Sequence, residues 1–132
     1  MTSRRSAFLV FIACCLIAGC AAVIVGAGAG AGTYAYLNGE LKRSYQANYD
    51  KTYKACTGLL RDLKLSIKEE TTDGVKTTID TERSDGTPMK IGIEILNPDW
   101  TEVSVRTGFV GLWKKDISKQ FHEFLEERLK KG

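Results

Sequence analysis

Three runs between residues 75 and 107 alternate apolar or threonine side chains with charged and polar ones. The runs are 75–83, 89–96 and 101–107, and the turn sequences around them are Asp73-Gly74, Asp85-Gly86 and Asn97-Pro98-Asp99. A two-residue period places alternate side chains on opposite faces of a β-strand. Because the connections are short, the pattern predicts antiparallel neighbours whose sheet has one apolar face and one wet face.

Leu65 and Ile67 open a further strand that fades at Glu69-Glu70. Apolar side chains three and four residues apart predict helices on both sides of the strands. The first covers 40–63, with its stripe at Tyr45, Tyr49, Tyr53, Cys56, Leu60 and Leu63; the second starts near Asp116, with Asp116 or Ser118 as N-cap and its stripe at Ile117, Phe121, Phe124, Leu125 and Leu129. We therefore expect an α+β fold, a four-stranded antiparallel meander with an N-terminal and a C-terminal helix packed on one face (α-β-β-β-β-α).

The chain begins with the three parts of a secretory signal peptide. Arg4 and Arg5 are followed by an uncharged, strongly apolar run from Ala7 to Ala18, and then by the small residue Gly19. Twelve residues of helix rise only about 18 Å, which is too short for the roughly 30 Å hydrocarbon core of a bilayer. We interpret residues 1–19 as a signal peptide that is removed.

The sequence Ile17-Ala18-Gly19-Cys20 resembles the lipobox of bacterial lipoproteins. The resemblance implies cleavage between Gly19 and Cys20, a diacylglyceryl group on the Cys20 thiol, and acylation of the new amine. Two of the four cysteines, Cys14 and Cys15, lie in the discarded segment, so Cys56 is the only other thiol of the mature chain. No intrachain disulfide is expected.

Residues 20–39 are rich in glycine and alanine, with Gly26, Gly28, Gly30 and Gly32 alternating with alanine. One interpretation is a lipid-proximal tether ahead of a domain at 40–132. The alternative is an uncleaved single-pass protein, in which the uncharged run from Ser6 through Gly39 crosses the membrane and associates through small-residue spacing. Both interpretations stay open on the sequence alone.

Catalytic and metal-binding patterns are missing from the sequence. His122 is the single histidine and is expected to be exposed on the polar side of its helix, while Cys56 is expected to be buried. Without Arg4 and Arg5 the chain has 17 basic and 16 acidic residues, which gives no electrostatic footprint for nucleic acid. We expect no cofactor, no metal site and no catalytic residue, and charge pairing across the wet sheet face.

One segment, 108–115 (GFVGLWKK), is apolar although it lies between two elements. It can dock on the core, or it can form an edge that binds a partner, because exposed aromatic residues are enriched at interfaces. The candidate interaction surface comprises Trp113, Phe109, Trp100 and Arg106.

Together with the lipobox, the segments 33–45 (TYAYLNGELKRSY), 50–56 and 101–108 resemble a family of short bacterial lipoproteins of unknown function. The family pattern has a strand that ends in an arginine before a glycine-containing turn, here Arg106 followed by Gly108 and Gly111. Members often carry an aspartate after the second glycine, where this chain has Leu112. The resemblance implies localisation in the cell envelope and no known activity. Ala21 after the lipidated cysteine, in place of an aspartate, favours the outer membrane, facing the periplasm.

The sequence thus favours a membrane-anchored envelope lipoprotein with a small non-catalytic binding or structural domain. The partner would be an envelope protein, a lipid or a wall component. The alternatives are the uncleaved single-pass protein and a small periplasmic hydrolase.

Overall fold

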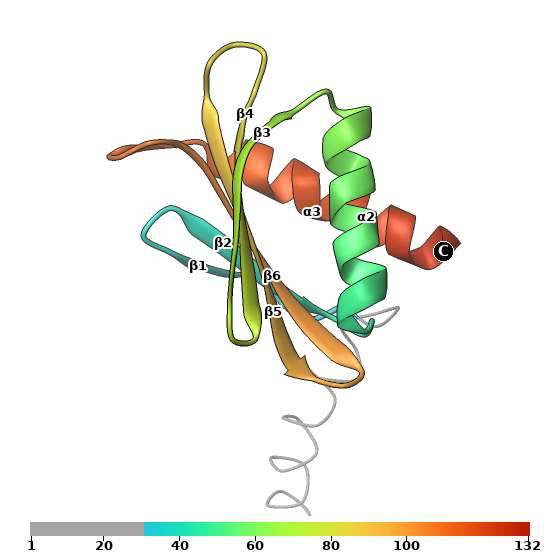
Figure 1. Ribbon diagram of the computed structural model, residues 1–132. Coiled ribbons are helices and arrows are strands. Elements are labelled where there is room, and N and C mark those ends of the chain that lie inside the picture. The colour runs from blue at the N-terminus through green and yellow to red at the C-terminus, as the bar shows by residue number, and fades with distance from the viewer. Residues whose placement is uncertain (1–30) are drawn as a thin grey trace, which may run out of the picture.

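Two helices cross one face of a seven-stranded antiparallel sheet (Figure 1). The computed structural model describes residues 31–132. The elements in chain order are β1 (Ala35–Leu37), β2 (Glu40–Tyr45), α2 (Tyr49–Asp62), β3 (Ser66–Asp73), β4 (Lys76–Glu82), β5 (Pro88–Asn97), β6 (Trp100–Phe109), β7 (Leu112–Trp113) and α3 (Lys115–Lys131). The strand order is β1-β2-β6-β5-β4-β3, and β7 pairs with the end of β6.

The predicted α-β-β-β-β-α order with a four-stranded meander is wrong. The sheet has additional strands, and one helix lies in the middle of the chain while the other ends it. The expected helix at 40–63 is in fact strand β2 followed by α2. Leu41 and Tyr45 are both buried, and a four-residue step puts two side chains on the same face of a strand as well as of a helix. The spacing therefore cannot distinguish the two structures.

Helix α2 begins where a capping residue permits it. The side-chain oxygen of Asn48 accepts a hydrogen bond from the Lys51 backbone nitrogen at 2.9 Å, which satisfies a free donor of the first turn. From there the predicted stripe holds in part, because Cys56 and Leu60 are fully buried against the sheet while Leu63 is exposed. Tyr49 and Tyr53 are half-buried, and the Tyr49 hydroxyl lies 2.6 Å from that of Thr77.

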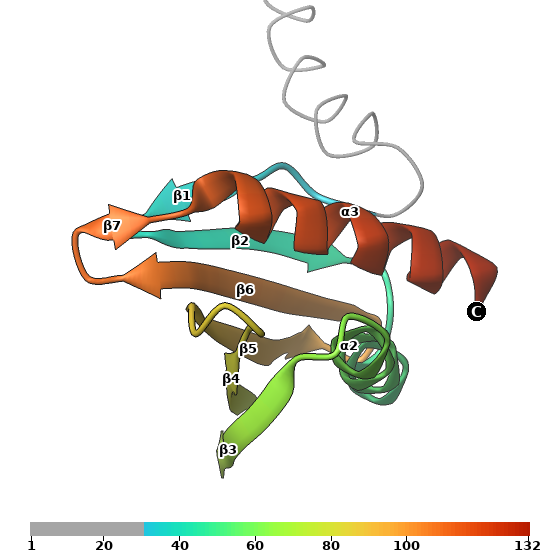
Figure 2. The same ribbon diagram turned by 90° about the horizontal axis from the view of Figure 1, so that it is seen from above.

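The apolar sheet face and the two helices form one core. Ile79, Ile91, Ile93, Val103 and Val105 are fully buried, as their alternation in the sequence predicts. Helix α3 packs on β2 and β6, and α2 packs on β5, β6 and β3 (Figure 2). Helix α3 places Phe121 and Leu125 in the core. Its N-cap is Lys114 rather than Asp116 or Ser118, and no side chain caps it.

The signal peptide at 1–19, the cleavage position and Cys20 lie outside the described residues. Ala31 forms a β-bridge with Tyr45, and β1 follows, so the packed part of the chain includes nine residues that the sequence placed in the tether. The possible membrane helix through Gly39 also lies mostly outside the described residues, and within them its last part is strand and turn. Neither helix between residues 31 and 132 is long and apolar enough to cross a bilayer.

Candidate functional site

Two hairpin turns lie side by side at one end of the sheet, and we call this region the hairpin end. It comprises residues 36–39, where β1 turns into β2, and residues 108–113, where β6 turns into β7 (Figure 2). Glycines shape both turns. Gly39 has φ +82, and any Cβ there would collide with the Trp113 ring. Gly108 has φ +111, and a Cβ there would collide with the Leu112 carbonyl oxygen.

The hairpin end exposes apolar side chains that no helix covers. Leu37 is 70% exposed, Phe109 59%, Val110 90% and Leu112 73%. Four large apolar side chains are thus exposed on two neighbouring turns. The predicted apolar segment 108–115 is therefore not folded into the core, apart from Trp113, whose side chain is half-buried over Gly39.

Cation–π contacts hold the hairpin end in shape. The Arg106 guanidinium carbon lies 5.4 Å from the centre of the Trp113 ring, and the Lys115 ammonium lies 4.8 Å from the centre of the Tyr36 ring. Arg106 Nη2 also donates to the Glu40 carboxylate at 3.3 Å. Side chains on β2, β6 and β7 are thereby tied together where the sheet ends.

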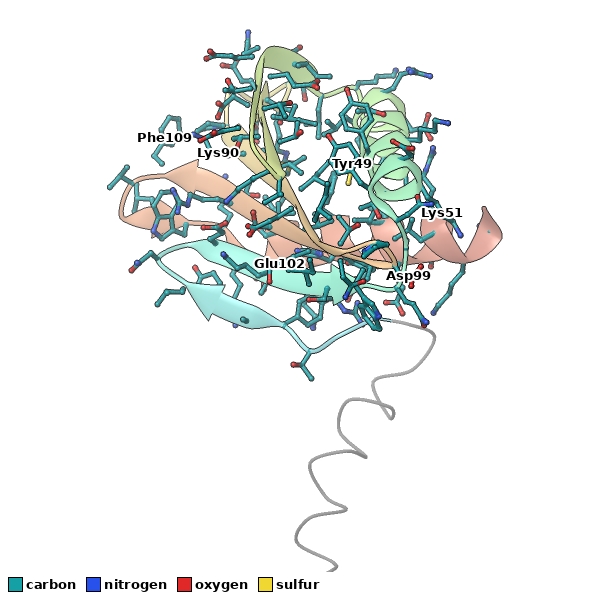
Figure 3. The ribbon with its side chains drawn as sticks, turned by 60° about the horizontal axis from the view of Figure 1, so that its bottom comes forward. Tyr49, Lys51, Lys90, Asp99, Glu102 and Phe109 are labelled. Atoms are coloured by element: carbon teal, nitrogen blue, oxygen red, sulfur yellow. The ribbon has the colours of Figure 1, made fainter. Side chains whose placement is uncertain are left out.

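The structure brings together only three of the four residues of the predicted interaction surface. Phe109, Trp113 and Arg106 meet at the hairpin end. Trp100 starts β6 at the far end of the same strand, beside the turn after β5. Figure 3 shows this separation, because Phe109 and Asp99 lie at opposite ends of the molecule. The nine residues of extended strand from Trp100 to Phe109 span roughly 30 Å, and the predicted strand at 101–107 already implied this separation.

The prediction for His122 is wrong, because the side chain is fully buried rather than exposed. Its Nε2 donates to the Leu41 carbonyl oxygen at 2.9 Å, and that contact fixes the tautomer. Nδ1 is then an acceptor, and the Tyr45 hydroxyl donates to it at 2.7 Å. His122 thus joins α3 to β2 through two buried hydrogen bonds.

The pKa of His122 is lowered to about 4, mainly because the ring is buried. The hydrogen bond to Leu41 raises the pKa in part, and the positive charge of Arg43 lowers it. Arg43 itself donates to Glu126 at 2.7 Å and to the Tyr34 hydroxyl at 3.2 Å. This cluster fastens the C-terminal helix to the sheet. The sequence signal that was missed is the position of His122, one helical turn after the buried Ser118 and three residues before Leu125.

Cys56 is buried and free, as predicted, and burial raises the pKa of its thiol to about 12. A neutral thiol with no access to solvent is a poor nucleophile. Within residues 31–132 no three His, Cys, Asp or Glu side chains are grouped as metal ligands would be.

The wet sheet face pairs its charges across strands, as expected. Lys90 lies 3.2 Å from Asp80, and Lys42 lies 3.5 Å from Glu102. Figure 3 shows Lys90 and Glu102 on this face, with Tyr49 on the helical side of the sheet.

The described residues thus form a small two-layer α+β domain with exposed apolar side chains at one end of its sheet. The chain belongs to the family described as Protein of unknown function (DUF3568), which matches residues 6–128. The sequence matches no curated protein.

Proposed function

We propose that the protein is a lipid-anchored, non-catalytic binding protein of the bacterial envelope, and that the hairpin end is its interaction surface. The anchor would be a diacylglyceryl group on Cys20, with a further fatty acid such as palmitate on its amine after cleavage behind Gly19. The Ile17-Ala18-Gly19-Cys20 sequence at the end of an apolar run supports it. Two or more acyl chains suffice for stable anchoring.

The exposure of Leu37, Phe109, Val110 and Leu112 at one end of the sheet is the observation that carries the binding role. Burying apolar surface on a partner releases roughly 25 cal/mol per Å². Aromatic side chains such as Phe109 and Trp113 are enriched at the centres of interfaces.

The position of the hairpin end favours a protein partner over the bilayer. The described chain enters at Ala31, which pairs with Tyr45 at one end of β2, while the hairpin turn Asn38-Gly39 lies at the other end. Six residues of extended chain between Ala31 and Leu37 span roughly 20 Å. If the domain is attached to the membrane through its N-terminal side, the apolar turns lie at the end of the domain away from the membrane, where another envelope protein can contact them.

The absence of catalysis is part of the proposal. The two side chains best suited to proton transfer or nucleophilic attack, His122 and Cys56, are buried on the helical side of the sheet, away from the hairpin end. Ala21 favours an outer-membrane location facing the periplasm. The single-pass protein and the small hydrolase remain as alternatives, and the labelling experiment below separates the single-pass protein from the anchored one.

The anchor is tested by labelling cells with radioactive palmitate. Label should enter the protein and be lost in a Cys20→Ala variant, and the intact mass should correspond to a chain that starts at Cys20 and carries acyl groups. A full-length, unlabelled chain in the membrane fraction would refute the anchor and support the single-pass alternative.

The interaction surface is tested by a photoreactive amino acid at position 112 in intact cells. We expect one discrete protein adduct, which a Leu37→Asp substitution on the neighbouring turn removes. Val75 is the matched control, because it is also an exposed apolar residue beside a turn but lies between β3 and β4. Equal adducts from positions 112 and 75, or adducts with phospholipid alone, would refute a protein partner at the hairpin end.

A further inference from the structure

A hollow of about 250 Å³ opens on the wet face of the sheet, on the side opposite the two helices. Its lining residues come from four neighbouring strands and are Glu40, Lys76, Thr78, Lys90, Gly92, Ser104 and Arg106. Three of these side chains are cations and one is a carboxylate, so the lining carries two net positive charges. The proposed binding role of the hairpin end does not use this hollow.

Gly92 forms the floor of the hollow. In the sheet register Thr78 and Ser104 lie directly on either side of it, and Lys90 precedes it by two residues on the same face. A Cβ at position 92 would collide with the Ser104 hydroxyl and would lie 3.0 Å from Cε of Lys76. The Ser104 hydroxyl and the Lys76 side chain can lie this close over the sheet only because position 92 has no side chain.

The cations of the hollow are not all neutralised. Lys90 pairs with Asp80 at 3.2 Å and Arg106 with Glu40 at 3.3 Å, but Lys76 has no ion pair among residues 31–132. The carboxylate opposite Lys76 across the strands, Glu94, makes no salt bridge with it.

Arg106 also has capacity left for an acceptor. Its Nε is the one buried side-chain donor in the described part of the chain without a hydrogen-bond partner. A buried donor that lacks an acceptor is unfavourable, so the guanidinium of Arg106 is not fully satisfied by Glu40.

We propose that this hollow binds a phosphate group. Lysine and arginine side chains with adjacent hydroxyls are the donors that recognise phosphate oxygens, and arginine provides the planar fork that suits them. At about 250 Å³ the hollow has room for a phosphate carried on a small organic group. That group comes either from a soluble phosphorylated compound or from a phospholipid headgroup.

Trp113 provides the probe, because its ring stacks on Arg106 at the rim of the hollow. The chain has two tryptophans, so a Trp100→Phe background leaves the fluorescence of Trp113 alone. Full-length protein in micelles of an uncharged detergent is titrated with inorganic phosphate at constant ionic strength. The expected result is a saturable change in Trp113 fluorescence that chloride does not reproduce.

Lys76 supplies the decisive variant. Lys76→Ala should weaken phosphate binding about tenfold, the loss typical of one charge-assisted hydrogen bond, and Lys76→Arg should restore most of it. Lys68→Ala is the matched control, because it removes the same charge from an exposed lysine that does not line the hollow. No saturable response to phosphate, or equal weakening by the two alanine variants, would overturn the proposal.

Reconstitution in vesicles separates the two sources. If the headgroup is the ligand, phosphatidylglycerol added to phosphatidylcholine vesicles shifts the Trp113 fluorescence without free phosphate, and Lys76→Ala removes the shift. A phosphate response without any lipid effect assigns the hollow to a soluble phosphorylated compound. Both results support a phosphate site. A lipid effect without any response to phosphate would contradict the site, because general attraction of the protein to a charged surface would explain it. Labelling at Cys20 is a separate measurement, so failure of the anchor and failure of this site are distinguishable.

Discussion

Acidification should lower the stability of this protein through His122. The side chain is fully buried, its Nε2 donates to the Leu41 carbonyl, and its Nδ1 accepts from Tyr45. A protonated ring would lose the Tyr45 hydrogen bond, would bury a charge and would face the cation Arg43. The folded state therefore keeps His122 neutral at pH values where the unfolded chain binds a proton.

The size of the effect follows from the two pKa values. The pKa of His122 falls from 6.5 to about 4 on folding. Each unit corresponds to about 1.4 kcal/mol, so the largest loss of unfolding free energy is roughly 3 kcal/mol. The unfolded state binds more protons between the two values, so stability falls as the pH drops through 6.5 and levels off below 4. Between pH 7 and pH 5 the expected loss is roughly 2 kcal/mol.

Two measurements check this prediction. Because the chain has a single histidine, NMR titration of its ring reports one pKa without assignment, and it should lie near 4. Urea unfolding at pH 7 and pH 5 then compares the wild type with His122→Gln, whose amide can still donate to Leu41 but does not titrate. The variant controls for the carboxylates, which titrate in both proteins. An NMR pKa near 6.5, or the same pH dependence in both proteins, would refute the reasoning.

Two further substitutions and one labelling experiment test the packing. In urea unfolding, Gly39→Ala should lower the free energy of unfolding by about 1–3 kcal/mol more than Gly74→Ala does. Both glycines have positive φ, but only Gly39 lies against the Trp113 ring, so equal decreases would exclude that contact. Leu60→Ala should lose about 2–5 kcal/mol in the same assay, because the side chain is fully buried between helix and sheet, and a loss below 1 kcal/mol would contradict its place in the core. The Cys56 thiol should react with a thiol reagent only at the rate of unfolding, and fast labelling of the native protein would show that it is accessible.

The sequence predicted the central strands because their pattern has only one structural solution. Strict alternation from Thr77 to Thr81 and from Met89 to Ile93 excludes a helix, and Asp85-Gly86 supplies the turn. Residues 40–45 lacked such a signal. Leu41 and Tyr45 are four residues apart, which fits a strand and a helix equally, and the tyrosines that follow extend the helical spacing backwards. Only tertiary pairing of β2 with β6 decides between them.

The candidate site, like the fold, could be predicted from the sequence only in part. The apolar segment 108–115 is visible in the sequence, and its exposure is not, because a glycine-bounded apolar loop can fold inwards or outwards. The hollow at Gly92 could not be predicted from the sequence. In the sequence, a glycine within an alternating strand indicates only a local weakening of the strand. Its place on the floor of the hollow becomes clear only from the register, which puts Thr78 and Ser104 on either side of it.

Arg106 links the hairpin end and the hollow, because it lines the hollow and also contacts Trp113. Trp113 closes over Gly39 at the hairpin end, and its ring also stacks on Arg106, which lines the hollow. An anion that draws the guanidinium towards Lys76 would change the support under Trp113 and with it the position of the apolar turn 109–112. Binding at the hollow and binding at the hairpin end would then be coupled, and the coupling would have to be reciprocal. Arg106→Lys, which keeps the charge but lacks the planar group that Trp113 stacks on and that suits phosphate oxygens, should weaken that coupling and also weaken phosphate binding.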